Sequence, residues 1–358
     1  MRNFLSFAKT GLLFLLLAAC SPLSPGPIAP SVQISGFATT AQKPQLPAEA
    51  RLQPDPQMPE AWNRHLRESA TQPLQTACQP FHLPARGSRQ GAILLFHGYS
   101  ACPQQYWELA PRLAARGFDV YVPLLPGHGR APRPEGNLWQ DRSDDLPTEQ
   151  DWTRYQRQAR ELAEVMPTQG QRVVAGLSLG GAVAASALIQ APQHFDRGLI
   201  MTALLDVHSP QNKILPLLNA VTGARKTDWG AGCERERAGG RGGYCQFRMQ
   251  HLRALQIFGQ KTLAEIHKIQ VPLQISGVEK DPVIDNGALF QAARKVKQSQ
   301  LCLMEAGVNH SMLSPYDTPD QPKFWLPTLF RQLDRFLITG QFFTTRGVGE
   351  GNQPRCGF

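Results

Sequence analysis

The sequence has no C-x-x-C pair and no paired-histidine spacing beside its seven cysteines, so a structural zinc site is not expected. Its 31 glycines and 30 prolines follow no Gly-X-Y period, which excludes a collagen-like chain. Charged residues make up only 18%, but apolar residues reach 42%, enough for a sizeable core, so wholesale disorder is excluded as well. The formal net charge of +9 bears on solubility and attraction to surfaces rather than on nucleic-acid binding. A length of 358 residues allows one large domain or two modest ones.

The N-terminal apolar run is too short to span a bilayer. Residues 11–19 read GLLFLLLAA after a basic start, a layout typical of a secretory signal. The run ends in Leu17-Ala18-Ala19-Cys20, which resembles the lipobox of bacterial lipoproteins, whose cysteine becomes the acylated N-terminus. The resemblance implies a signal peptide over 1–19, lipidation of Cys20 and, because Ser21 follows, an outer-membrane lipoprotein facing the periplasm. An ordinary cleaved signal with an unrelated cysteine is the alternative.

Proline dominates the next segment. Between Ser21 and Pro59 there are nine prolines and only four charged residues. Such a composition buries little apolar area, and proline keeps the chain extended. We therefore expect a semi-rigid tether over 20–59, a folded domain over 60–340 and a tail over 341–358.

Six cysteines remain once Cys20 is assigned to the lipid. An even number in an oxidising compartment indicates disulfides, although fifteen connectivities are possible. Cys233 and Cys245 enclose a short glycine-rich stretch and are the easiest pair to close. The other four are Cys78, Cys102, Cys302 and Cys356.

Strand-like and helix-like patterns alternate through the folded part. Short apolar runs predict buried strands at 91–96, 118–124, 171–175, 198–205, 271–276 and 300–305. Helical spacing of apolar residues predicts helices at 103–116, 148–166, 179–190 and 323–338. This alternation predicts an α/β fold with a mostly parallel central sheet and helices on both faces.

One motif indicates catalysis. Gly176-Leu177-Ser178-Leu179-Gly180 is a G-x-S-x-G sequence between a predicted strand and a predicted helix. This is the context of a nucleophile elbow, in which the glycines allow a tight turn and the serine hydroxyl is presented at the sheet edge. We therefore predict that Ser178 is a nucleophile. The N-terminus of the following helix would place backbone N–H groups beside the negative charge that develops during the attack.

A serine hydroxyl needs a base to take its proton, and the base needs an acid to orient it. His310 follows the last short strand and is the candidate base. Asp281 follows the strand at 271–276, and catalytic groups collect at such strand ends. The competing acids are Glu279, Asp285 and Asp206.

An oxyanion hole needs two backbone donors. The Leu179 amide directly follows the nucleophile and supplies one. The other is expected from the loop after an early strand, where His97-Gly98-Tyr99 fits and the Tyr99 amide is the candidate. His97 itself is expected to hold this loop by hydrogen bonds rather than to act as a base.

Four stretches together resemble one family. In chain order they are LLFHGYSACPQQYWELAPRLAARGFDVYVPLLPGHG, GLSLGG, EKDPVID and GVNHS. From about residue 85 to 340 the chain is similar to the α/β-hydrolase superfamily, in the branch of bacterial carboxylesterases, monoglyceride lipases and serine aminopeptidases. The resemblance implies the α/β-hydrolase fold with a lid insertion, and a serine–acid–histidine order that favours Asp281. Asn309, where the family commonly has glycine, and one extra residue before Asp281 depart from its pattern.

The family resemblance places a lid at about 206–270. The run Ile214-Leu215-Pro216-Leu217-Leu218 offers it an apolar wall for an acyl chain, or simply packs the lid on the core. Residues 223–253 hold seven glycines, seven basic residues and three acids. The run around 238–243 superficially suggests RNA-binding Arg-Gly repeats, but a flexible lid loop is the preferred interpretation.

Two enzymatic functions are open. The first is a serine hydrolase that cleaves short-to-medium acyl esters or monoacylglycerol-like substrates through an acyl-enzyme, without cofactor or metal. The alternative is a serine aminopeptidase, similar to proline iminopeptidases, which needs lid acids that are scarce here. A lipoprotein scaffold with a relic fold is disfavoured because Ser178, Asp281 and His310 are all present in order. The expected partners are an ester substrate and, through the lipid, a membrane; nucleic acid is not expected, and the oligomeric state is open.

Overall fold

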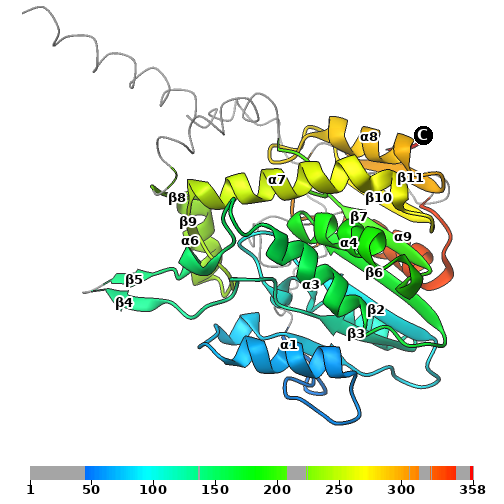
Figure 1. The fold of residues 1–358 in the computed structure, drawn as a ribbon, viewed down its shortest axis with the longest axis horizontal. Coiled ribbons are helices and arrows are strands. Elements are labelled where there is room, and N and C mark those ends of the chain that lie inside the picture. The colour runs from blue at the N-terminus through cyan, green and yellow to red at the C-terminus, as the bar shows by residue number, and fades with distance from the viewer. Residues whose placement is uncertain are drawn as a thin grey trace, which may run out of the picture. The chain divides into compact units, whose positions relative to one another are not determined.

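The computed structural model describes residues 45–135, 138–207, 223, 225–305, 307–313, 323, 325–343 and 355–357. Their centre is an eight-stranded sheet in the order β1-β3-β2-β6-β7-β10-β11-β12 (Figure 1). The strands from β3 to β11 pair in parallel, and the two edge strands pair antiparallel. Their bounds are β1 Phe81–Leu83, β2 Gly91–Phe96, β3 Phe118–Val122, β6 Gln171–Leu177, β7 Arg197–Met201, β10 Leu273–Val278, β11 Ser299–Met304 and β12 Arg355–Cys356. The predicted mostly parallel α/β sheet is confirmed.

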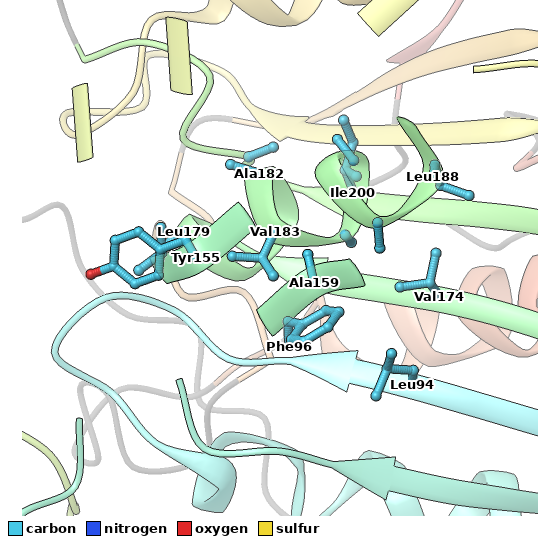
Figure 2. Close-up of a cluster of buried hydrophobic side chains, with 14 of the residues drawn as sticks. Leu94, Phe96, Tyr155, Ala159, Val174, Leu179, Ala182, Val183, Leu188 and Ile200 are labelled. Carbon is cyan, nitrogen blue, oxygen red and sulfur yellow. The ribbon is translucent and has the colours of Figure 1, made fainter. Parts of the chain in front are cut away.

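Helices cover both faces of this sheet (Figure 1). Because side chains alternate along a strand, Leu94 and Phe96 of β2 join one core cluster while Ile93 and Leu95 join the other. Figure 2 shows the first cluster, in which Phe96, Val174 and Ile200 of the sheet lie against Ala159 and Val183 of two covering helices. That face is covered by α1 (Glu60–Ala70), α3 (Thr153–Ala163), α4 (Leu179–Gln190), α7 (Met249–Glu265) and α8 (Asn286–Lys295), the other by α2 (Leu109–Ala114) and α9 (Leu326–Thr339).

The remaining described elements are short. They are two antiparallel strand pairs, β4 (Arg133–Glu135) with β5 (Leu138–Gln140) and β8 (Lys226–Asp228) with β9 (Gln246–Arg248), the helix α6 (Ala231–Ala238), and the 3₁₀ turns η2 (Thr76–Cys78), η3 (Pro103–Tyr106), η4 (Ser143–Asp145), η5 (Pro192–His194) and η6 (Ile266–Lys268). None of the helices in the described ranges is both long and apolar enough to cross a membrane.

The folded unit extends beyond the range expected from composition. Leu46, Ala50 and Leu52, which the proline content assigned to the tether, pack against the core cluster of α2 and α9. Arg51 also pairs with His82 of β1, at 2.8 Å from the Arg51 amide to the His82 carbonyl oxygen. At the other end, Cys356 of the expected tail lies in β12 and pairs with β11. A proline-rich segment can therefore pack where its few apolar side chains meet an open sheet edge.

The predicted lid differs from the structure at two points. Its C-terminal part is α7, whose Ala254, Leu255 and Phe258 are buried in the core cluster, so this helix belongs to the layer over α4. The glycine-rich run expected to be a flexible loop is instead held by hydrogen bonds and a disulfide. The apolar run at 214–218 lies outside the described residues.

The six cysteines of the folded unit form three disulfides. The expected Cys233–Cys245 pair is confirmed, with Cα atoms 5.6 Å apart, and joins α6 to the residue before β9. The other two pairs, Cys78–Cys102 and Cys302–Cys356, could not be read from spacing. The second of these attaches β12 to β11.

Buried histidines hold the loop that follows β3. The His65 Nε2 atom accepts a hydrogen bond from the Leu124 amide at 3.1 Å, and His97 Nε2 accepts one from the Leu125 amide at 3.0 Å. A ring nitrogen that accepts must be unprotonated, and burial lowers the pKa of both histidines to about 4. Burial also lowers the pKa of His128, in the same loop, well below its ordinary value. The fold thus depends on three neutral histidines.

We expect the free energy of unfolding to fall as the pH is lowered from about 7.5 to about 5.5. Above a pH of about 6.5 these histidines are neutral in both states. Below it the unfolded chain binds protons that the folded chain does not, until the pH reaches the folded pKa, which is about 4 for His65 and His97 and well below its ordinary value for His128. The loss should be about 1 kcal/mol for each of the three histidines. Urea unfolding at both pH values measures it. His65→Gln should flatten the dependence by about a third, and an equal stability at both pH values would contradict the assignment.

Candidate active site

Ser178 sits at the turn between β6 and α4 in a strained backbone conformation. Its φ is 56° and its ψ −118°, a combination that non-glycine residues rarely adopt. Backbone strain of this kind is concentrated at functional sites. A Cβ at Gly180 would overlap the carbonyl oxygen of Phe96, and one at Gly176 would overlap the carbonyl oxygen of Gly180. The two glycines of the motif are therefore required by close backbone packing around the serine. Ser178 itself is 5% exposed.

His310 and Asp281 complete a line of hydrogen bonds from Ser178. The Ser178 Oγ atom lies 2.9 Å from His310 Nε2, and His310 Nδ1 lies 2.8 Å from Asp281 Oδ2. The second carboxylate oxygen of Asp281 accepts from the amides of Val283 at 2.8 Å and Ile284 at 3.1 Å. The three side chains come from loops after β6, β10 and β11, so the parallel strands bring them together at one sheet edge.

The charge on Asp281 determines which way these hydrogen bonds run. Burial alone would raise the pKa of this carboxyl, but the hydrogen bond and charge interaction with His310 and the two backbone amides lower it below its ordinary value. An ionised carboxylate only accepts, so His310 Nδ1 carries the proton and donates it. His310 Nε2 then has a free lone pair, to which the Ser178 hydroxyl can donate.

The three competing acids are bonded elsewhere. Glu279 forms an ion pair with Arg355 at 3.4 Å, and Asp285 caps α8 by accepting from the Gly287 amide at 2.8 Å. Asp206 accepts from the Val207 amide and the Gln260 side chain. Of the four carboxylates that the sequence left open, Asp281 is thus the one hydrogen-bonded to His310.

The segment His97–Cys102, here called the oxyanion loop, lies against the serine. A Cβ built on Gly98 would be 3.5 Å from Ser178 Cβ, which places the loop in van der Waals reach of the nucleophile candidate. The Gly98 amide donates to Gln105 Oε1 at 2.8 Å, and protonated Nδ1 of His97 donates to the Gly98 carbonyl at 2.9 Å. Within the described residues, the amides of Tyr99 and Leu179 have no hydrogen-bond partner, so both remain available to a bound oxygen.

Two supporting residues were not expected from the sequence. The Gln105 side chain, from η3, fixes the Gly98 peptide. Thr202, which directly follows β7 and has a φ of 39°, donates its hydroxyl to the His310 carbonyl oxygen at 3.0 Å. The Thr202 contact joins segments 108 residues apart, whereas the Gln105 contact spans only seven. Neither residue type carries a pattern that would have marked it.

A cavity of about 390 Å³ lies between α1, the loop after β3 and α3. Arg64, Arg130, Arg154 and Arg157 contribute to its wall, but Ser178, His310 and Asp281 do not. This polar cavity is therefore separate from the serine. In the described part of the chain, no three His, Cys, Asp or Glu side chains are grouped so as to hold a metal ion.

Comparison with known proteins agrees with this architecture. The family described as "Alpha/beta hydrolase family" matches residues 93–322, and no curated protein matches. Solved structures with similar folds include a monoacylglycerol lipase from Paleococcus ferrophilus (14% identity, TM-score 0.55, covering 74% of this chain and 100% of that one). A structure from work on the metagenome-derived lipolytic enzymes LipS and LipT has 20% identity and a TM-score of 0.54, covering 74% of this chain and 99% of that one. A monoglyceride lipase from Saccharomyces cerevisiae has 18% identity and a TM-score of 0.54, covering 73% of this chain and 91% of that one. These identities support the fold alone; the family match, over more than half of the sequence, shows that the chain belongs to the α/β hydrolase family.

Proposed function

We propose that this hydrolase cleaves carboxylic esters through an acyl-enzyme on Ser178. The observation that carries the proposal is the continuous hydrogen bonding from the Ser178 hydroxyl through His310 to a buried Asp281, at 2.9 and 2.8 Å. In this arrangement Ser178 can lose its proton to His310 Nε2, while the Asp281 carboxylate holds the other ring nitrogen, Nδ1. The lipases among the structures of similar fold support an ester as substrate.

The proposed reaction follows from the donors around the serine. His310 Nε2 takes the hydroxyl proton as Ser178 Oγ attacks the ester carbon, and Asp281 stabilises the imidazolium that forms. The amides of Tyr99 and Leu179 bind the oxyanion of the tetrahedral intermediate. His310 then returns the proton to the leaving alcohol, and a water activated by the same nitrogen releases the acid.

A serine aminopeptidase remains the alternative on the same residues. Such an enzyme needs free carboxylates near the active site to hold the substrate's amine. In the described insertion the acids are few, and Glu234 and Glu236 form ion pairs with Arg237 and Arg241. This pairing supports the esterase over the peptidase.

Ser178→Ala should abolish ester hydrolysis, with a loss of about 10⁴-fold or more in kcat, while the protein stays folded. His310→Ala should fall nearly as far because the residues act as a unit. Hydrolysis of p-nitrophenyl esters measures the loss, and circular dichroism checks the fold.

The acid has its own matched controls. Asp281→Asn should cost far more activity than Glu279→Gln, Asp285→Asn or Asp206→Asn, because only Asp281 contacts His310. If one of the three controls were the more damaging substitution, the acid would have to be reassigned. More than a few per cent of activity in Ser178→Ala would remove the serine from the mechanism.

We further propose that the ester has a medium-length acyl chain. An apolar acyl pocket gains about 0.8 kcal/mol per buried methylene, which is about fourfold in kcat/KM for each one until the pocket is filled. The value of kcat/KM on p-nitrophenyl esters should therefore rise from acetate to a medium chain and then fall, with monoacylglycerols accepted and long triacylglycerols poor. Flat or falling activity from acetate upward would exclude an acyl pocket. Aminoacyl p-nitroanilides tested in parallel would, if cleaved faster than any ester, favour the peptidase.

Finally, we propose that Cys20 carries a lipid that anchors the protein to the bacterial envelope, facing the periplasm. The packing of Leu46 onto the core shortens the expected tether to about 25 residues, a reach of about 80 Å if fully extended. The wild-type protein should fractionate with membranes, and Cys20→Ser should release it or leave it unprocessed. Mass spectrometry of the N-terminal peptide identifies the lipid. A soluble wild-type protein with an unmodified Cys20 would refute the anchor.

A further inference from the structure

The insertion touches the oxyanion loop through Trp229 and through residues 239–245, here called the glycine loop. The Tyr244 amide donates to the Ser100 carbonyl oxygen at 2.8 Å. The Trp229 Nε1 atom donates to the Ser100 hydroxyl oxygen, also at 2.8 Å. Ser100 directly follows Tyr99, is 2% exposed and has a φ of 54°, in the left-handed region that favours glycine. Both contacts therefore hold a strained residue next to a proposed oxyanion donor.

Two glutamine side chains bind the glycine loop to the body of the hydrolase. Gln104 accepts from the Gly242 amide at 2.7 Å and donates to the Gly240 carbonyl at 2.8 Å. Gln75 accepts from the Gly243 amide at 3.0 Å and donates to the carbonyl of the same residue at 3.1 Å. Each primary amide thus satisfies one donor and one acceptor of the loop backbone, as a neighbouring strand would.

The glycine loop approaches the oxyanion loop so closely that only glycine fits at two of its positions. Gly243 has a φ of 102°, and a Cβ there would overlap the Ser100 carbonyl oxygen. A Cβ on Gly242 would lie 2.8 Å from the Cys102 sulfur, so the Cys78–Cys102 disulfide lies directly beneath the loop. The glycines of this run therefore serve close packing on the oxyanion loop.

The aromatic rings continue the same contact. The ring of Tyr99 lies 5.5 Å from that of Phe247 in β9 and 6.4 Å from that of Trp229, centroid to centroid. The Cys233–Cys245 disulfide closes the glycine loop at its C-terminal end, where Asp141 also accepts the Cys245 amide at 2.7 Å. The loop is thus fixed at its base by a covalent bond and at its tip by Gln104.

We propose that the glycine loop and Trp229 together form a positioning element for the oxyanion hole. On the N-terminal side of the Tyr99 amide, Gln105 and His97 fix Gly98 by hydrogen bonds. On its C-terminal side, the glycine loop fixes Ser100 through the Tyr244 amide. Trp229, Gln104 and Tyr244 are positioning residues, and the Cys233–Cys245 disulfide keeps the loop in register. The inference rests on the proposed esterase function, since it assigns the loop an effect on transition-state stabilisation.

Two variants test the proposal. Trp229→Phe removes one hydrogen bond from a side chain that is 44% exposed, so folding should be unaffected. The double variant Cys233→Ala/Cys245→Ala frees the base of the loop. Each should lower kcat on a p-nitrophenyl ester about tenfold with KM within about twofold, because a misplaced donor weakens the transition state and not substrate binding. Affinity for an alkyl trifluoromethyl ketone, whose serine adduct carries an oxyanion, should fall by the same factor.

Asp144→Asn is the matched control. It removes an ion pair of 2.6 Å between η4 and Arg248, which also joins the insertion to the body but does not touch Ser100. Its kcat and ketone affinity should equal those of the wild type. Wild-type kcat in both test variants, or an equal loss in the control, would overturn the proposal. If the double variant does not fold, Trp229→Phe alone decides.

Hydrogen exchange separates this proposal from the esterase function. The amides of residues 97–102 should exchange faster in Trp229→Phe and in the double variant than in the wild type or in Asp144→Asn. If the wild type cleaves no ester, the proposed function fails and exchange at these amides decides on the glycine loop. Unchanged exchange in both variants would then overturn the loop's role.

Discussion

The contact between the end of β2 and the turn from β6 into α4 is the constraint on which the site depends. A side chain at Gly180 would overlap the Phe96 carbonyl oxygen, so α4 can begin directly after the serine only if that position is glycine. Because the strand order runs from β3 through β2 to β6, the chain reverses direction across the sheet at this contact. In open α/β sheets such a switch point is where a crevice for ligands opens. The proposed nucleophile and the oxyanion loop therefore meet as a consequence of topology and backbone packing.

Sequence alone predicted what is encoded locally. The elbow glycines, the buried strands around β2, β6 and β10, and the covering helix α4 all appear as short patterns, and they match the structure. Their ends were less accurate: the strand expected over 198–205 stops at Met201, because Thr202 turns into a positive φ to reach the His310 carbonyl. Asp281 could be preferred only through family order, since nothing in its neighbours distinguishes it from Glu279 or Asp285.

Features that depend on distant segments could not be predicted. Composition assigned Leu46 to a tether because the core cluster against which it packs is built from residues far along the chain. The pairing of Cys302 with Cys356 follows from β12 adding to β11, a contact across 54 residues of sequence. The glycine loop was misjudged for the same reason. Its composition is typical of a flexible loop, but contacts with distant segments, among them Gln75 and Gln104 more than 130 residues earlier, hold it in place.

Burial favours the neutral form of every ionisable group at this site, and hydrogen bonds to the charged form determine which group stays charged. His97 and His128 are fully buried with few compensating contacts, and burial lowers the pKa of both. Asp281 is also buried, at 2% exposed, yet its carboxylate accepts three hydrogen bonds, which outweigh burial and keep it charged. The result is one fixed negative charge beside His310, with a neutral His97 within the oxyanion loop and a neutral His128 packed against Tyr99. Neutral His97 keeps the Nε2 lone pair that accepts the Leu125 amide and so holds this loop. Ionised Asp281 keeps the proton on His310 Nδ1 and leaves Nε2 free for the Ser178 hydroxyl, so both charge states serve the same proposed chemistry.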